Sequence, residues 1–269
     1  MHATSALRPR VRAARRALLA SSVLAAALVP ASPASAYFDG PAYAFPVPDY
    51  VSGLIGQSAL SHAYAASGSS SRGTRSRTKS KSKSKAKPKP KPKRATARQL
   101  RALRFVPKPE VTARIHQVLV ERTGRPAAEI VPIFDGVKAD WERVLTRTVK
   151  WSARDLGDAA AFTFLQLNRV YRGQSRLKGS VVAALRKQVR TDLALNRGVR
   201  RLPDADKQQA AEMLQLRTVF LASNLEATQQ AGDTAGARTA REDVRRFTRE
   251  IYGVDLAKVK LTSKGLARR

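Results

Sequence analysis

LGDAAAFTFLQLNRVY (residues 156–171) is the stretch of this 269-residue chain that decides its fold. Wound as an α-helix, it distributes apolar side chains around the whole axis: Phe162, Phe164, Leu165, Leu167, Val170 and Tyr171. A helix that is apolar on every side is a buried one, because no face of it suits contact with water. We therefore expect a buried helix from about Asp155 to Tyr171, inside a helical domain.

Two helices are expected before this stretch. The first runs from Glu110 to Thr123 and is stopped by Gly124 and Pro126. Its apolar stripe is formed by Val111, Ile115, Val118 and Leu119. The second runs from about Gly136 to Lys150, with Asp135 as its N-cap. Its buried face is formed by residues spaced four apart, Trp141, Leu145 and Val149.

Three further helices are expected after it. The first, from Ser180 as N-cap to Asn196, ends before Gly198 and turns inward Val182, Leu185, Val189 and Leu193. The second, Asp204 to Gln230, has one apolar side with Met213, Leu216 and Phe220 and another with Leu214, Leu221 and Leu225. Such a two-sided helix belongs at the centre of a bundle. The last, Thr234 to Tyr252, ends at Gly253 and buries Ala237, Ala240, Val244, Phe247 and Ile251.

These patterns predict an all-α fold, a compact bundle of about five to six helices after a disordered basic N-terminal region. No convincing strand pattern and no internal repeat is found. The 175 residues after Arg94 are ample for one domain. The chain contains no cysteine, which excludes disulfides and thiolate metal sites, so core burial alone must stabilise that domain.

The N-terminus has the three parts of a secretory signal in the right order. Basic residues come first: Arg8, Arg10, Arg12, Arg15 and Arg16. The apolar stretch Ala17–Val29 follows, and Ala34-Ser35-Ala36 is a small-residue cleavage site. The apolar stretch has 13 residues, whereas a bilayer-spanning helix needs about 20, so a permanent anchor is the weaker alternative. We expect export by the general or the twin-arginine route, cleavage after Ala36, and a periplasmic or extracellular mature protein.

Two low-complexity segments follow the signal. Residues 37–71 are rich in Ala, Gly, Ser and aromatic residues and have no sustained helical or strand period. Residues 72–97 form a Lys/Arg-Ser/Pro tract that is expected to be disordered and extended, and the helical domain then occupies residues 98–269. Twelve cations of the tract are candidate anion-binding residues: Arg72, Arg75, Arg77, Lys79, Lys81, Lys83, Lys85, Lys87, Lys89, Lys91, Lys93 and Arg94. The alternative is a solvated spacer that lysine repulsion keeps extended.

The net charge of the chain indicates the class of partner to expect. The formal net charge is +31, of which residues 72–94 contribute +12 and residues 95–269 contribute +16. Such a field favours polyanions and anionic surfaces over proteins of ordinary charge density. The expected partners are lipopolysaccharide, teichoic acid, acidic polysaccharide or extracellular nucleic acid.

The helical domain has its own candidate anion-binding residues. Arg238, Arg241, Arg245 and Arg249 fall on one arc of the last helix, away from its apolar stripe, and Glu242 can offset their repulsion through Arg238, Arg245 and Arg246. A second stripe is formed by Arg186, Arg190, Arg197 and Arg201. The alternative for both stripes is a solvated basic face.

No catalytic constellation is recognisable. Only one histidine, His116, belongs to the domain, and it is expected to be partly exposed at the edge of an apolar stripe. Asp155 and Asp158 are expected to cap a helix rather than act as an acid/base pair. Gln166 and Asn168 predict a buried hydrogen-bond network, with a ligand pocket as the alternative, and Trp141 and Trp151 are assigned to the core rather than to a sugar platform. The sequence predicts no enzyme activity and no cofactor.

Three stretches carry a resemblance: LGDAAAF (156–162), LPDADK (202–207) and YGVDLAKVKLTSKGL (252–266). They resemble a family of uncharacterised exported bacterial proteins that join a signal peptide and a low-complexity spacer to a helical C-terminal domain of unknown function. The resemblance implies an exported helical domain and assigns no catalytic residue. The function expected is that of a non-enzymatic envelope protein; the alternatives are a nucleoid-like DNA-binding protein, if the signal is not used, or an unrecognised exported enzyme.

Overall fold

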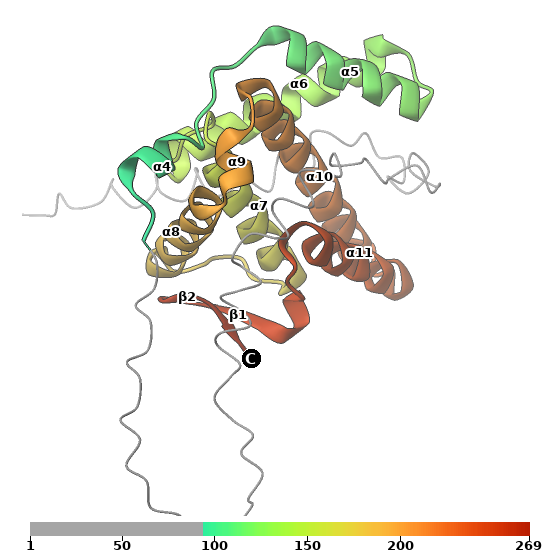
Figure 1. Ribbon diagram of the computed structural model, residues 1–269. Helices are drawn as coiled ribbons and strands as arrows, with labels where there is room; N and C mark the ends of the chain where they lie inside the picture. Colours follow the sequence, from blue (N-terminus) through green and yellow to red (C-terminus); the bar gives the residue numbers. More distant parts are fainter. Residues whose placement is uncertain (1–93) are drawn as a thin grey trace, which may run out of the picture. The chain divides into compact units, whose positions relative to one another are not determined.

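The computed structural model describes residues 94–269, and the predictions made for residues 1–93 lie outside them (Figure 1). The described part is mainly helical, which confirms the predicted all-α class. Its α-helices are α4 (Ala97–Arg101), α5 (Pro109–Thr123), α6 (Ala127–Arg143), α7 (Leu156–Tyr171), α8 (Gly179–Leu195), α9 (Arg197–Arg201), α10 (Asp204–Gln230) and α11 (Thr234–Tyr252). Short elements complete it: the π-helix η3 (Val144–Thr148), the 3-10 helix η4 (Leu256–Lys258) and the strands β1 (Val259–Thr262) and β2 (Gly265–Arg268).

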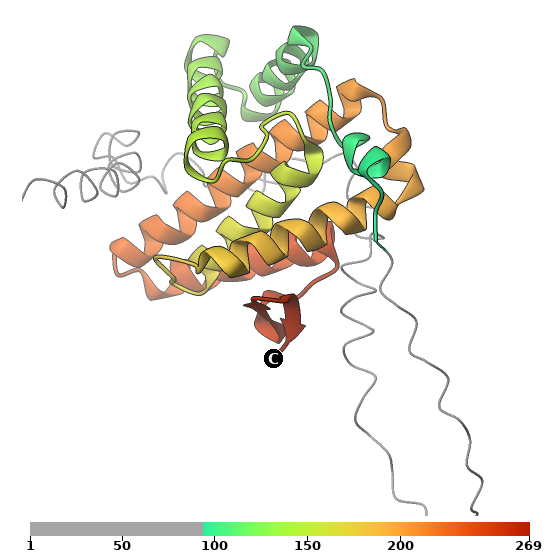
Figure 2. The same ribbon diagram turned by 90° about the vertical axis from the view of Figure 1, so that its left-hand side faces the viewer.

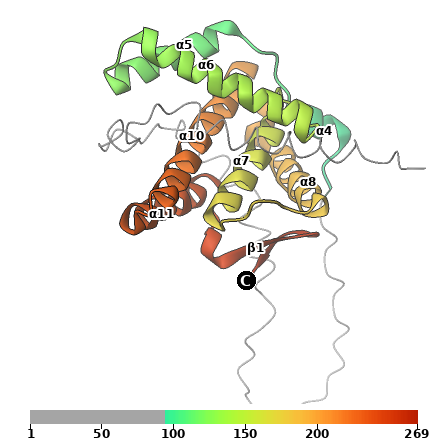
Figure 3. The ribbon, with the colours of Figure 1, turned by 180° about the vertical axis from the view of Figure 1, so that it is seen from behind.

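The helix α7 is the buried centre that its sequence predicts. Asp155 caps it, because its carboxylate accepts a hydrogen bond from the Asp158 backbone N–H at 3.1 Å. Every residue of α7 from Leu156 to Leu165 is buried. Figure 3 shows α7 between α10 and α8, the two helices with which it makes its main contacts. Trp141 and Trp151 both pack edge-on against Phe162, so they belong to the core, as predicted.

The long helix α10 separates two apolar clusters, which confirms its predicted two-sided character. Leu214 and Leu225 face the main core around α7 and α11. Met213 and Leu216 face a second cluster, whose other buried members are Val111, Ile115, Leu119, Phe134 and Val137 of α5 and α6. Figure 2 shows α5 and α6 as a pair on one side of α10, with α7 and α11 on the other.

The start of α6 was predicted wrongly. The helix begins at Ala127, so Asp135 lies inside it and contacts the His116 ring at 3.1 Å instead of acting as an N-cap. Pro132 is tolerated within α6 because it lies on the exposed face, where the carbonyl that loses its N–H partner can be hydrated. After Arg143 the helix continues into η3, which buries Leu145.

The helix α8 begins at Gly179 with Lys178 at the N-cap position, so Ser180 is not its cap. Leu185, Val189 and Leu193 face inward, as predicted. Gly198 does not end α8. It lies inside α9, whose N-cap Asn196 accepts hydrogen bonds through its side chain from the backbone N–H groups of Gly198 and Val199.

The helix α11 agrees with its prediction in both bounds, and Gly253 ends it at φ 65°. Val244, Phe247 and Ile251 are buried, and α11 packs along α10. The buried Tyr252 hydroxyl donates a 2.8 Å hydrogen bond to the Ala160 carbonyl of α7. Tyr252 therefore joins the last helix to the central one.

The absence of strands was predicted wrongly at the C-terminal end. β1 and β2 form an antiparallel hairpin in which Val259 pairs with Arg268 and Leu261 pairs with Leu266. Leu261 and Leu266 are partly buried against the main core, while Lys260 is exposed on the other face. The strands have four residues each and depend on contacts with distant segments, so no local pattern long enough to predict them exists.

Candidate functional site

The predicted basic tract reaches the described structure only at its end. Arg94 is exposed, and the other eleven candidate cations of the tract lie outside the described residues. The chain then enters α4, whose N-cap Thr96 and N3 residue Gln99 form a reciprocal capping box. Leu103 and Phe105, just after α4, are buried in the main core. The tract therefore ends at a helix that is fixed to the domain.

Two of the four candidate arginines of α11, Arg245 and Arg249, are held in ion pairs. Arg245 is held by Asp255 through two hydrogen bonds, at 3.1 and 2.9 Å, and by Glu242 at 2.5 Å. Arg249 also pairs with Glu242, at 2.7 Å. The hydrogen bonds from Arg245 hold the pKa of Asp255 below its usual range. Glu242 therefore offsets the charges of Arg245 and Arg249, and not those of Arg238 and Arg246.

Two of the four α11 arginines remain available. Arg238 and Arg241 are exposed, and neither has an acidic partner within hydrogen-bond distance in the described structure. Arg246 pairs with Asp243 instead. The α11 surface therefore offers two uncompensated cations, fewer than the sequence predicts.

The predicted arginine stripe on α8 is wrong because its first two members point inward. Arg186 donates two hydrogen bonds of 2.7 Å to the Asp158 carboxylate, and Arg190 donates one of 2.6 Å to Asp155. Both aspartates are fully buried at the start of α7. Burial raises the pKa of Asp155, the charge of Asp158 raises it further, and Arg190 opposes both effects. The predicted capping role is confirmed for Asp155 alone, because the Asp158 carboxylate accepts a hydrogen bond from the Ser152 backbone N–H rather than from the helix. The sequence also did not reveal that the two aspartates pair with arginines of α8.

The exposed positive charge gathers where acidic residues are missing. No Asp or Glu occurs between Asp49 and Glu110, between Asp158 and Asp192, or after Asp255. The described parts of these three segments meet in space, because α8 contacts α4 and both strands of the hairpin. We call their exposed cations the basic face: Arg94, Arg98, Arg101, Arg176, Lys178, Lys187, Lys258, Lys260, Lys264, Arg268 and Arg269.

Specific hydrogen bonds fix the hairpin part of the basic face to the domain. Arg172, just after α7, donates to the carbonyl oxygens of Leu256 and Val259, the latter at 2.6 Å. Gln188 of α8 accepts a 2.8 Å hydrogen bond from the Leu266 backbone N–H. Burial lowers the pKa of Arg172, and the positive charge of Arg269 lowers it further, so like charges already crowd this end of the molecule. A signal for this region was present in the sequence: residues 256–269 contain five cations and no acid.

The structure bears on three possible catalytic features: a metal site, His116, and the pair Asp155 and Asp158. Within residues 94–269, no three His, Asp or Glu side chains converge as a metal site requires. His116 is partly exposed against Phe134 and Asp135, as expected of an ordinary histidine. Asp155 and Asp158 lie buried in ion pairs rather than across a cleft, so they are not arranged for glycoside hydrolysis.

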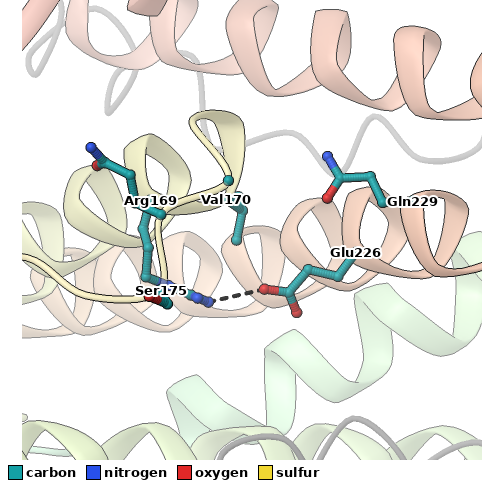
Figure 4. Close-up of a pocket in the computed structure, with 7 residues that line it drawn as sticks. Arg169, Val170, Ser175, Glu226 and Gln229 are labelled. Atoms are coloured by element: carbon teal, nitrogen blue, oxygen red, sulfur yellow. Dashed lines mark hydrogen bonds and ion pairs between the residues drawn. The ribbon is translucent and has the colours of Figure 1, made fainter.

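A pocket of about 210 Å³ lies between the end of α7 and the end of α10 (Figure 4). Arg169 and Glu226 form an ion pair of 3.0 Å across it, and Gln166 accepts a 2.9 Å hydrogen bond from Arg169. Asn168 is buried and is not among the residues that line the pocket, and its side-chain nitrogen finds no partner in the described structure. Of the predicted Gln166–Asn168 network, only the Gln166 contact is therefore formed.

Asp192 of α8 is a half-buried carboxyl group that sequence reasoning missed. Its Oδ2 atom is buried without a hydrogen-bond partner among the described residues. Burial raises the pKa of Asp192 to about 7. The carboxyl group of Asp192 therefore titrates close to neutrality.

Comparison with known proteins gives one result. The model of a family of unknown function, DUF6683, matches residues 13–269. No curated protein and no solved structure gives a significant match to the chain. None of the helices within residues 94–269 has the length and hydrophobicity that a membrane span needs. Because the family model covers nearly the whole chain, the protein belongs to the family of unknown function DUF6683.

Proposed function

We propose that this protein is an exported, non-enzymatic envelope protein that binds anionic polymers through its basic tract, residues 72–97. The observation that carries the proposal is the separation of charge along the chain. All but two of its 20 acidic residues follow Arg94, while the tract itself contains none. A segment with twelve cations and no internal counter-charge attracts polyanions strongly.

The acids of the folded domain support this proposal because most of them already have partners. Asp158, Glu212, Glu226 and Asp255, among others, are held in ion pairs with arginine or lysine side chains of the domain. Few carboxylates are left to neutralise the tract from within the same molecule. An external polyanion therefore meets little internal competition.

The test is the salt dependence of polyanion binding by the chain starting at Tyr37. Fluorescence anisotropy with labelled lipoteichoic acid and with duplex DNA should show an affinity loss of at least about 10³-fold between 50 and 200 mM salt, as expected when six or more phosphates are neutralised. A variant with the twelve tract cations changed to glutamine should lose most of this binding. A control with the same tract residues in shuffled order should keep it. Equal binding by the glutamine variant at moderate salt contradicts the proposal and leaves the tract a spacer.

Export has a separate test, which is the N-terminal sequence of the protein isolated from its own cells. The signal pattern of residues 8–36 supports cleavage after Ala36. A chain that begins at Tyr37 in the envelope or medium fits the proposal. An uncleaved cytoplasmic chain contradicts it and favours a nucleoid-like DNA-binding protein.

A further inference from the structure

We propose that the folded domain binds a linear phosphodiester polymer on the basic face formed by α4, α8 and the C-terminal hairpin, as a continuation of the tract. This inference rests on the proposed function and adds a second site to it. The binding surface of the domain is then the basic face, which lies on a different side of the molecule from the arginines of α11.

The three elements of the basic face adjoin one another. Figures 1 and 3 show α8 lying between α4 on one side and the β1–β2 hairpin on the other. The tract leads directly into α4, since Thr96 is its N-cap. A polymer bound along the tract therefore reaches α8 and then the hairpin without leaving positively charged surface.

The cations on the inner side of α8 have acidic partners, whereas the cation on its outer side has none among the described residues. The inward Arg186 and Arg190 are neutralised by the buried aspartates at the start of α7. The outward Lys187 has no such partner in the described structure. Lys258, at the end of η4, and Lys260 and Lys264 of the hairpin are exposed in an acid-free segment. None of these four lysines has an ion pair within residues 94–269.

The hairpin part of the basic face is rigidly held. The hydrogen bond from Arg172 holds β1 at the end of α7, and the one to Gln188 holds β2 on α8. The Arg269 backbone N–H also donates to the Lys258 carbonyl at 3.0 Å. Cations fixed on an ordered scaffold lose less conformational entropy on binding than cations on a free chain. The basic face can therefore add affinity beyond that of the tract.

The kinds of side chain found around the cations indicate the chemistry of the partner. Among residues 94–269, the large hydrophobic side chains that are exposed are Val106 and Ile133, which lie near α5 and on α6. The basic face therefore offers charge without a stacking platform, which suits a polymer backbone rather than single-stranded bases. Arginine also matches phosphate oxygens in a two-point geometry. Eleven cations on three adjoining segments fit the closely spaced charges of a phosphodiester chain.

The experiment uses the chain starting at Tyr37 with its twelve tract cations changed to glutamine, so that only the folded part can bind. The probe is inorganic polyphosphate, a phosphoanhydride-linked chain that presents closely spaced phosphate charges without sugars or bases, and its affinity is measured at 50 and 200 mM salt. In this background, Lys260→Gln with Lys264→Gln is compared with Arg238→Gln with Arg241→Gln. Both pairs remove two exposed cations, so the net charge changes equally.

The hairpin pair should weaken polyphosphate binding, and it should reduce the affinity ratio between the two salt concentrations by about tenfold, as expected for two lost phosphate contacts. The α11 pair should leave both values close to those of the background. Equal effects of the two pairs would mean that only net charge matters and would overturn the inference. So would an effect of the α11 pair alone.

Separate arms with poly(glycerol phosphate) teichoic acid and with duplex DNA distinguish the source of the phosphodiester chain. A carboxylate polysaccharide should bind more weakly than either, and tighter binding of this polymer would contradict the chosen chemistry. Loss of all polyphosphate binding in the glutamine background, with the wild-type tract still active, refutes this inference and leaves the proposed function intact. Absence of binding by the wild-type chain refutes the proposed function itself.

Discussion

At the scale of single residues, the ionic groups of α8 and α11 differ in how well they are compensated. Arg186 and Arg190 are matched by Asp158 and Asp155, whereas the Oδ2 atom of Asp192, on the same helix, is buried without a hydrogen-bond partner in the described structure. Removing one member of a buried pair is strongly destabilising, because it leaves an uncompensated charge. An unpaired buried carboxyl has the opposite property, since its removal relieves the cost of burying it.

Asp192→Asn should therefore stabilise the protein, and the gain should depend on pH. The folded pKa of Asp192 is raised from 3.8 to about 7, so the unfolded chain ionises first as pH rises. Stability from this group is highest below the unfolded pKa and falls by about 1.4 kcal/mol per pH unit between the two values. Urea unfolding of the wild-type protein and of Asp192→Asn at pH 5 and pH 8 measures this dependence on pH. The control is Glu121→Gln, which changes an exposed acid. A gain from Asp192→Asn that is the same at both pH values contradicts this account.

Arg245 and Arg241 make a matched pair on α11. Arg245→Gln removes two hydrogen bonds to Asp255 and should lower the free energy of unfolding by about 1 kcal/mol, a value reduced by partial exposure. Arg241→Gln should change it by less than about 0.5 kcal/mol, because Arg241 is exposed and has no ion pair among the described residues. The lowered pKa of Asp255 stabilises the fold above its unfolded pKa, and this contribution is lost as pH falls. Denaturation of both variants at pH 7 and pH 4 should show the Arg245→Gln deficit shrinking in acid. A larger effect of Arg241→Gln would contradict the structure.

At the scale of elements, the start of α7 is where three segments converge. A Cβ atom at Gly157 would lie 2.8 Å from Leu103 Cδ1 and 2.9 Å from Arg190 Cγ. Real Cβ atoms do not approach other heavy atoms so closely, so glycine at this position lets α8 and the segment after α4 pack against α7. The same approach allows Arg190 to reach Asp155.

Gly157→Ala should therefore destabilise the protein, although alanine favours a helix by about 1 kcal/mol over glycine. Gly136→Ala is the control, because Gly136 lies on the exposed side of α6 and a Cβ atom there would meet nothing within 4 Å. This control should stabilise the protein by up to about 1 kcal/mol. Urea midpoints of the two variants should move in opposite directions. If both midpoints rise, the close packing at Gly157 is not real.

Helices whose ends are marked by nearby residues could be predicted from the sequence, whereas elements that depend on distant contacts could not. The bounds of α10 and α11 were predicted because Pro203, Gly253 and long apolar patterns lie within them or at their ends. The start of α6 was missed because Pro132 resembles a boundary, and its harmless position on the exposed face is a tertiary fact. The hairpin was missed because Arg172 and Gln188, both distant in sequence, hold it.

The candidate site divides in the same way. A charge count along the chain identifies the tract and its lack of acids. It cannot tell that Arg186 and Arg190 turn toward buried aspartates, or that Arg245 is held by Asp255, because these pairs join residues on different segments. The basic face could not be predicted, because no pattern in the sequence shows that the three acid-free segments lie next to one another.

At the scale of the whole molecule, the tract and the basic face together form the surface proposed for a linear phosphodiester polymer. In Figure 1 the hairpin and α5 lie at opposite ends of the described part. Lysines at these two ends therefore differ in their expected contact with the polymer. Lys258, Lys260 and Lys264 belong to the basic face, whereas Lys108, also exposed, is the N-cap of α5.

The most direct measurement is lysine acetylation of the chain starting at Tyr37, with and without inorganic polyphosphate, read residue by residue by mass spectrometry. We expect polyphosphate to slow acetylation of the tract lysines and of Lys258, Lys260 and Lys264, while Lys108 reacts at the same rate in both samples. High salt should abolish the protection, because exposed charges are then screened. Equal protection at Lys108 and the hairpin lysines, or no protection at the tract, would contradict the proposed surface.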